Sequence, residues 1–194
     1  MKRGVEIANN MIGLQDNVDR LAREDRLHRW VSGSWQNPEE LAVIMETLIG
    51  VVSDSARFQA VCIRLDHFQN LRMKPGHYME SVLNGIVQAV RGILKTDLVF
   101  METENRMAAL FCTEGFMSTE EMERGWIKVQ EKVLQEYQQG ITVGIGSRAL
   151  GISGMSESYR NAQTATYYRL VYGFGQVIAY EEIVSRVGTS PLYP

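Results

Sequence analysis

A regular alternation of strand-like and helix-like segments between residues 58 and 180 restricts the fold of this 194-residue chain more than any other feature. Short apolar runs rich in β-branched and aromatic residues predict strands at residues 58–65, 98–112 (a two-stranded hairpin), 141–145 and 176–180. Apolar residues spaced three or four apart predict helices at residues 76–94, 118–139 and 156–172. The order βαββαβαβ begins with the six elements of the ferredoxin-like arrangement. We therefore expect an α+β fold, a ferredoxin-like βαββαβ core with an extra αβ unit.

Two helix starts have recognisable signals. Ser118 begins the run Ser-Thr-Glu-Glu, which predicts a capping box with Glu121 and a helix that ends at Gly140. Asn37 followed by Pro38 predicts an N-cap and the first helical position of another helix.

The N-terminal residues have a different pattern, with apolar positions separated by four and three residues in turn. These positions are Ile7, Met11, Leu14, Val18 and Leu21. This is the a/d spacing of a coiled coil, so we expect a helical, coiled-coil-like linker that forms a homodimer. The alternative is an amphipathic helix that packs on its own domain. We expect a signalling and dimerisation helix at residues 1–36, the globular domain at 37–184 and a linker at 185–194.

Composition excludes several classes of protein. The net charge is −3 and the basic residues alternate with acids, which argues against a nucleic-acid-binding surface. No apolar run is long enough to insert into a membrane. Cys62 and Cys112 lie in apolar strand-like runs, where free buried thiols are expected, as in a reducing cytoplasm.

Other chemistry-bearing residues give weak patterns. His67 and His77 have no metal-ligand spacing, and Asp66 beside His67 is a poor acid–base candidate. The run from Gly144 to Gly146 lacks the third glycine of a dinucleotide fingerprint and more simply allows close packing. Four tyrosines on the last helix form a packing stripe, with a ligand pocket as the alternative: Tyr159, Tyr167, Tyr168 and Tyr172.

Two segments resemble the nucleotidyl-cyclase fold of GGDEF domains, namely FQAVCIRLDHF (58–68) and DLVFMETENRMAALFCT (97–113). In that family the first strand ends in a pattern like D-x-D-x-F-K, and the hairpin carries Gly-Gly-Asp/Glu-Glu-Phe. Here the two metal-binding carboxylates are replaced by Arg64 and Asn105, the next Glu is Arg106, and the second Asp survives as Asp66. The resemblance implies a vestigial site at these four positions, with no catalytic residue, metal or cofactor.

The similarity extends from about Leu14 to Ile183, and its most telling part is the run from Ile141 to Ile183. This run has a Gly-Ile-Gly strand end, a Ser-Tyr-x-x-Ala sequence, a tyrosine-rich helix, a glycine and an Ile-x-x-Tyr-Glu strand. It resembles the degenerate GGDEF-like domain of bacterial AraC-type transcription regulators, and regulators of purine catabolism have a similar domain. The resemblance implies a cytoplasmic, non-catalytic, signal-transmitting module. A receiver domain of a two-component system or a membrane sensor would precede it. A helix-turn-helix DNA reader, which this chain lacks, would follow it.

Two alternatives from other classes remain open. A divergent nucleotidyl cyclase would be an enzyme, but Arg64 and Asn105 argue against it, and we expect no enzymatic activity. A small-molecule or nucleotide sensor would use the same positions, because Arg64 and Arg106 can hold an anion through charge-assisted hydrogen bonds.

Overall fold

The computed structural model describes residues 19, 21–35, 37–50, 56–113 and 117–188, and the chain divides into two compact units, Met1–Val52 and Ser53–Pro194. In the first unit, residues 21–32 are helical and are followed by α2 (Pro38–Ile49). The Asn37 side chain accepts a hydrogen bond from the Glu40 N–H at 2.7 Å, which confirms the predicted cap. The domain boundaries expected at residues 36 and 184 stay predictions.

The predicted dimer seam falls largely outside the described residues. Ile7, Met11, Leu14 and Val18 lie there, whereas Leu21 is described and is 58% exposed. Homodimerisation therefore remains a prediction.

The second unit contains one five-stranded sheet in the order β2-β3-β1-β4-β5. The strands are β1 (Arg57–Leu65), β2 (Val99–Thr103), β3 (Arg106–Thr113), β4 (Ile141–Leu150) and β5 (Val177–Ala179). Neighbours among the first four strands are antiparallel, and β5 pairs with β4 in parallel. This is the ferredoxin-like order with one added strand, so the predicted fold class is confirmed.

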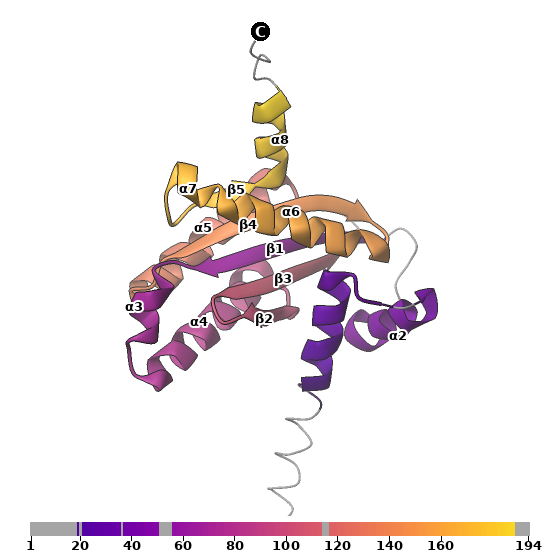
Figure 1. The fold of residues 1–194 in the computed structure, drawn as a ribbon, viewed down its shortest axis with the longest axis horizontal. Coiled ribbons are helices and arrows are strands. Elements are labelled where there is room, and N and C mark those ends of the chain that lie inside the picture. Colours follow the sequence, from indigo (N-terminus) through magenta and orange to yellow (C-terminus); the bar gives the residue numbers. More distant parts are fainter. Residues whose placement is uncertain (1–18, 20, 36, 51–55, 114–116, 189–194) are drawn as a thin grey trace, which may run out of the picture. The chain divides into compact units, whose positions relative to one another are not determined.

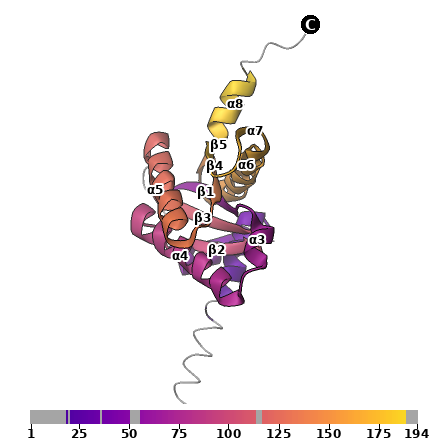
Figure 2. The ribbon, with the colours of Figure 1, turned by 90° about the vertical axis from the view of Figure 1, so that its left-hand side faces the viewer.

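Helices cover both faces of this sheet (Figure 1; Figure 2). The helices of this unit are α3 (Phe68–Arg72), α4 (Gly76–Leu94), α5 (Thr119–Tyr137), α6 (Met155–Tyr167), α7 (Arg169–Tyr172) and α8 (Tyr180–Gly188), with a 3₁₀ turn at Ile152–Gly154. The apolar stripes of α4 and α5 pack on one face of the sheet, where Ile63, Val90 and Trp126 are fully buried. The other face lies under α6 (Figure 2). Among the described residues, no helix is both long and apolar enough to cross a membrane.

Two glycines allow α6 to lie against β4. A Cβ atom on Gly144 would come within 2.2 Å of the Ala162 carbonyl oxygen, and one on Gly146 within 2.0 Å of the Ser158 carbonyl oxygen. Both distances are far shorter than a van der Waals contact. The interpretation of Gly144 and Gly146 as close-packing residues is therefore confirmed.

Several element boundaries differ from the prediction. The Ser118–Glu121 capping box is present, but the left-handed residue that ends α5 is Gln138, with φ 50°, rather than Gly140. The helix predicted at 156–172 is divided at Tyr168 into α6 and α7. α8 was not predicted, and Arg186 on it donates a hydrogen bond to the Tyr172 hydroxyl at 3.2 Å.

Candidate functional site

The positions that resemble the cyclase site meet at one end of the sheet. Arg64 on β1 lies directly opposite Arg106 on β3 in the antiparallel register. The N–H of Leu65 donates a hydrogen bond to the carbonyl oxygen of Asn105 at 3.0 Å, so the hairpin turn lies beside the end of β1. Residues about forty positions apart in the sequence are thus brought together as expected.

The two facing arginines have different partners. Nε of Arg106 lies 2.8 Å from the Glu102 carboxylate, and this ion pair is mostly buried. The Arg64 guanidinium lies over the Tyr167 ring, with 5.5 Å between its carbon and the ring centre. Within the described parts of the chain, the buried Nε and Nη1 of Arg64 have no hydrogen-bond partner. Buried donors without a partner are costly, so Arg64 is a cation whose hydrogen bonds the described residues leave incomplete.

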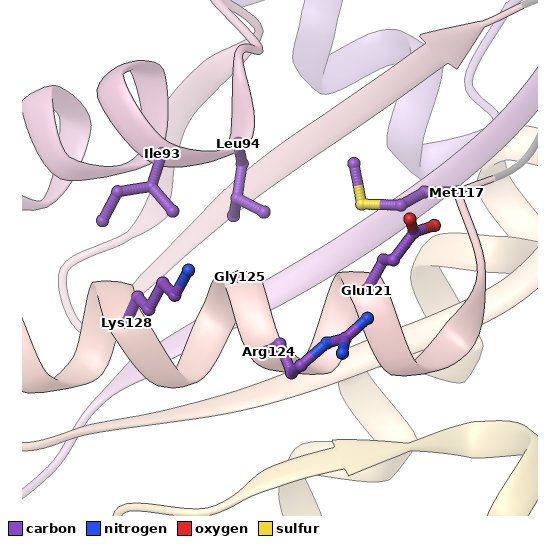
Figure 3. Close-up of a pocket in the computed structure, with 7 residues that line it drawn as sticks. All are labelled: Ile93, Leu94, Met117, Glu121, Arg124, Gly125 and Lys128. Atoms are coloured by element: carbon purple, nitrogen blue, oxygen red, sulfur yellow. The ribbon is translucent and has the colours of Figure 1, made fainter.

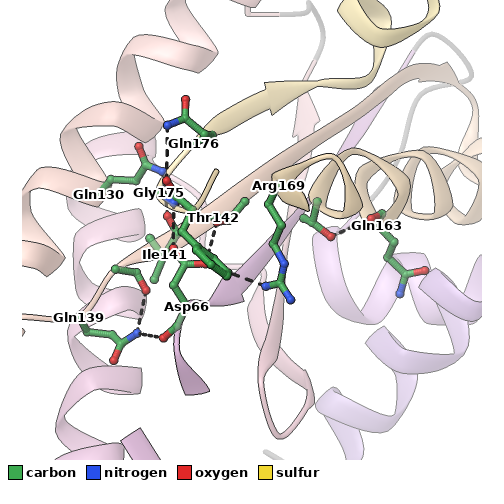
Figure 4. Close-up of polar contacts among 12 residues, drawn as sticks. Asp66, Gln130, Gln139, Ile141, Thr142, Gln163, Arg169, Gly175 and Gln176 are labelled. Carbon is green, nitrogen blue, oxygen red and sulfur yellow. Dashed lines mark hydrogen bonds and ion pairs between the residues drawn. The ribbon is translucent and has the colours of Figure 1, made fainter. Parts of the chain in front are cut away.

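Asp66 immediately follows β1, is 2% exposed and lies in a polar network (Figure 4). Its carboxylate accepts hydrogen bonds from the Thr142 hydroxyl at 2.7 Å and from the Gly175 N–H at 3.0 Å. Nη1 of Arg169 lies 4.0 Å from the same carboxylate. Burial raises the pKa of Asp66, and the two hydrogen bonds and Arg169 only partly oppose this shift.

A hollow of about 370 Å³ opens beside these residues. It combines amide groups, aromatic rings and one cation; its lining is Leu65, His67, Phe68, Gln69, Asn70, Asn105, Arg169 and Phe174. Burial lowers the pKa of Arg169, and the nearby positive charge of Arg64 lowers it further. Two positive charges, Arg64 and Arg169, thus lie near each other at this end of the sheet, which suits an anionic ligand.

The residues present do not fit the pair of divalent cations that a cyclase site would hold. Such ions require carboxylate oxygens, and Arg64 and Asn105 provide none. Three nearby carboxylates are engaged. Glu102 pairs with Arg106, Glu104 pairs with Arg72, and Asp66 accepts from Thr142 and Gly175. Among the described residues, no three His, Cys, Asp or Glu side chains form a group that could hold a metal ion.

The other candidate residues lie apart from this site. Cys62 and Cys112 are free, as predicted. Cys62 is buried, which raises its pKa to about 11, whereas Cys112 is only partly buried. His77 is exposed at the start of α4. A larger hollow of about 640 Å³ lies between the end of α4 and the start of α5 (Figure 3). Its lining is Ile93, Leu94, Met117, Glu121, Arg124, Gly125 and Lys128.

Sequence reasoning missed several residues of the site, chiefly Arg169, Phe174 and Thr142. Arg169 reaches the end of β1 from α7, more than one hundred residues along the chain. The Phe174 ring lies 4.6 Å from the His67 ring and 5.4 Å from the Arg169 guanidinium carbon. No short sequence pattern predicts contacts between residues so far apart in the chain. The isolated arginine in a tyrosine-rich stretch was the only available signal.

Two solved structures of GGEEF and GGDEF domains have the same fold. One is the active GGEEF domain of a diguanylate cyclase from Vibrio cholerae, with a TM-score of 0.51 and 15% identity over 64% of this chain and 83% of that one. Another is the GGDEF domain of DgcB from Caulobacter crescentus in complex with c-di-GMP, with a TM-score of 0.52 and 13% identity over 73% of this chain and 84% of that one. No curated protein sequence matches this chain.

A family model described as a GGDEF-like domain matches residues 22–166, well over half of the chain. The prediction that the chain is not an enzyme is therefore wrong. It relied on Arg64 and Asn105 alone, whereas the chain has a GGDEF-like domain and the fold of an active diguanylate cyclase domain. The two exchanges do not show that activity has been lost. By its fold and by this match, the chain belongs to the family of GGDEF-like domains.

Proposed function

We propose that this chain is a signal-transmitting module whose GGDEF-like domain binds a nucleotide through its phosphate groups at the end of β1. The main support for the proposal is the positive charge at the position where cyclase domains bind metal ions. Arg64 has buried donors without a protein partner, and Arg169 lines the adjacent hollow. A guanidinium group suits phosphate oxygens because its donors match them in pairs.

The remaining lining supports the same ligand class. Asn105, Gln69 and Asn70 offer amide donors and acceptors around the hollow. Phe174 and His67 offer ring faces on which a base can stack. These groups make the nucleotide a better candidate than a simple inorganic anion.

Calorimetric titration with GTP, ATP and pyrophosphate tests the proposal. We expect GTP or ATP to bind, and we expect Arg169→Gln to weaken binding by about tenfold or more, as loss of a charge-assisted hydrogen bond should. Arg91→Gln is the matched control, because Arg91 is an exposed arginine that pairs with Asp97. Binding of none of the three ligands, or equal binding by the Arg169→Gln variant, would contradict the proposal.

Turnover is measured in the same samples by following pyrophosphate release and dinucleotide formation. A product would make the bound nucleotide a substrate, in line with the enzymatic relatives of this fold. Arg64→Asp together with Asn105→Asp restores two carboxylates at the family positions, and tests whether they change product formation with Mg²⁺ present.

We also propose the cellular setting, a bacterial transcription regulator of AraC type. The support is the resemblance of the run from Ile141 to Ile183. In this setting a receiver or membrane-sensor domain lies upstream and a helix-turn-helix domain lies downstream. A reporter gene under the full-length protein should respond to Arg169→Gln and not to Arg91→Gln; equal responses would contradict this setting.

A further inference from the structure

Asp66 joins three segments of the chain that are distant in sequence (Figure 4). It follows β1, its carboxylate accepts a hydrogen bond from Thr142 on β4, and it accepts another from the N–H of Gly175. Arg169 at the start of α7 supplies the nearest positive charge, 4.0 Å away. We call Asp66, Thr142, Arg169 and Gly175 the Asp66 cluster.

The Asp66 cluster holds in place the segment from Arg169 to Gly175, which forms one wall of the hollow. Arg169 and Phe174 line the hollow, and Gly175 follows Phe174 directly. Gly173 and Gly175 have φ angles of 92° and 69°, a region that glycine adopts without strain. A loop with two such glycines has little stiffness of its own, so its position depends on its hydrogen bonds. The Gly175 N–H donates to Asp66 and to the Thr142 hydroxyl oxygen, and the Gln176 carbonyl accepts from the Val143 N–H.

The space around the carboxylate is tight. A Cβ atom on Gly140 would lie 3.3 Å from Oδ2 of Asp66, and Thr142 is fully buried. The side chain itself is turned into this network, and it is absent from the residues that line the hollow. A ligand in the hollow therefore meets Arg169 and Phe174 rather than Asp66.

We propose that Asp66 is a positioning residue for the ligand site, holding the Arg169 guanidinium and the Phe174 ring where a nucleotide meets them. This inference rests on the proposed function and adds the residue that sets the affinity of the site. Asp66 itself contacts no ligand.

Asp66 has two parts to its role: it accepts hydrogen bonds, and its negative charge attracts Arg169. Exchange of the carboxylate for an amide removes the charge and keeps the hydrogen bonds. In Asp66→Asn the amide oxygen can still accept from the Gly175 N–H, and the amide nitrogen can donate to the Thr142 hydroxyl. The loop stays bonded, but the charge that attracts Arg169 is lost. We expect GTP affinity to fall by about tenfold, because the carboxylate that lies 4.0 Å from Arg169 no longer attracts it. Asp97→Asn makes the same chemical change at an exposed position that pairs with Arg91, and it should leave affinity unchanged.

Removal of the whole group tests the loop without any ligand. In the free chain, hydrogen exchange followed by mass spectrometry should show the Gly175 amide exchanging at least tenfold faster in Asp66→Ala than in the unsubstituted chain. The Gly175 N–H then loses the nearer of its two acceptors, Asp66 at 3.0 Å, and keeps only the Thr142 hydroxyl oxygen at 3.2 Å. Asp66→Asn should retain the protection. Thr142→Val, which removes the hydroxyl at nearly constant volume, provides a second variant if Asp66→Ala does not fold.

The outcomes distinguish this inference from the proposed function. Failure of the unsubstituted chain to bind GTP, ATP or pyrophosphate would overturn the proposed function, and with it the ligand that Asp66 serves. Tight binding that is unchanged in Asp66→Asn would overturn the positioning of Arg169 alone. Equal rates of Gly175 amide exchange in the unsubstituted chain and in Asp66→Ala would show that Asp66 does not hold the loop, whichever ligand the hollow binds.

Discussion

At the scale of single residues, Asp66 combines a buried carboxylate with partners that only partly stabilise its charge. Thr142, Gly175 and Arg169 favour the ionised form, with a smaller contribution from His67, but burial outweighs them and the pKa is raised. The folded chain therefore holds the Asp66 proton more tightly than the unfolded chain does. Its contribution to stability is fully present below the ordinary pKa of Asp and is lost as the pH rises through the folded pKa.

Asp66→Asn should remove this pH dependence, because an amide does not titrate. We expect the variant to be at least as stable as the unsubstituted chain at neutral pH, with the advantage shrinking as the pH falls toward the ordinary pKa of Asp. Urea unfolding over a series of pH values measures the difference, with Asp97→Asn as the control. A variant that is less stable at neutral pH by about 1 kcal/mol or more, the net value of a hydrogen bond, would contradict the expectation.

The four positions taken from the cyclase resemblance were predictable as neighbours, because a strand end and a hairpin tip are both visible in the sequence. Their partners were not. Tyr167 over Arg64 and Arg169 beside Asp66 depend on where α6 ends, and the tyrosine-rich stretch contains no proline or glycine that would divide the helix before Gly173. The division at Tyr168 exposes Leu170 and Val171 and turns Arg169 toward the hollow.

At the scale of elements, segments with a clear period were predicted almost to the residue. α4 begins and ends at the expected residues, and the capping box fixes the start of α5. β4 continues to Leu150, five residues beyond the prediction, because after a bulge its last residues pair with the first residues of β1. This pairing depends on tertiary contacts. The polar residues Ser147 and Arg148 after Gly146 do not indicate a strand in the sequence.

A matched pair of glycines tests the packing of α6 on β4. Gly146→Ala places a Cβ against the Ser158 carbonyl, a backbone atom that cannot move alone, so we expect a loss of about 1–3 kcal/mol in the free energy of unfolding. Gly92→Ala lies within α4 with nothing inside 4 Å of the new atom, so it should gain about 0.5–1 kcal/mol. Denaturant titration of both variants gives the comparison, and a neutral Gly146→Ala would show that α6 can shift freely.

At the scale of the whole molecule, the N-terminal seam provides a proposed route to self-association. Ile7, Met11, Leu14, Val18 and Leu21 give only about two heptads, so a dimer through them should be weak and dependent on concentration. Sedimentation should show dimers at high concentration, and Leu14→Asp with Leu21→Asp should return the chain to monomer. Arg91→Gln serves as a control that leaves the seam intact. Dimers that survive the double substitution would place the interface on another surface.

The four-residue helix α7 has a mechanical consequence. Arg169, its first residue, lines the hollow, and Tyr172, its last, receives the hydrogen bond from Arg186 on α8. A helix of this length spans only about 6 Å, too short to absorb a rotation by bending. The two ends of α7 therefore move together. A ligand that shifted the backbone of Arg169 would also shift Tyr172, and the hydrogen bond from Arg186 would pass that shift on to α8.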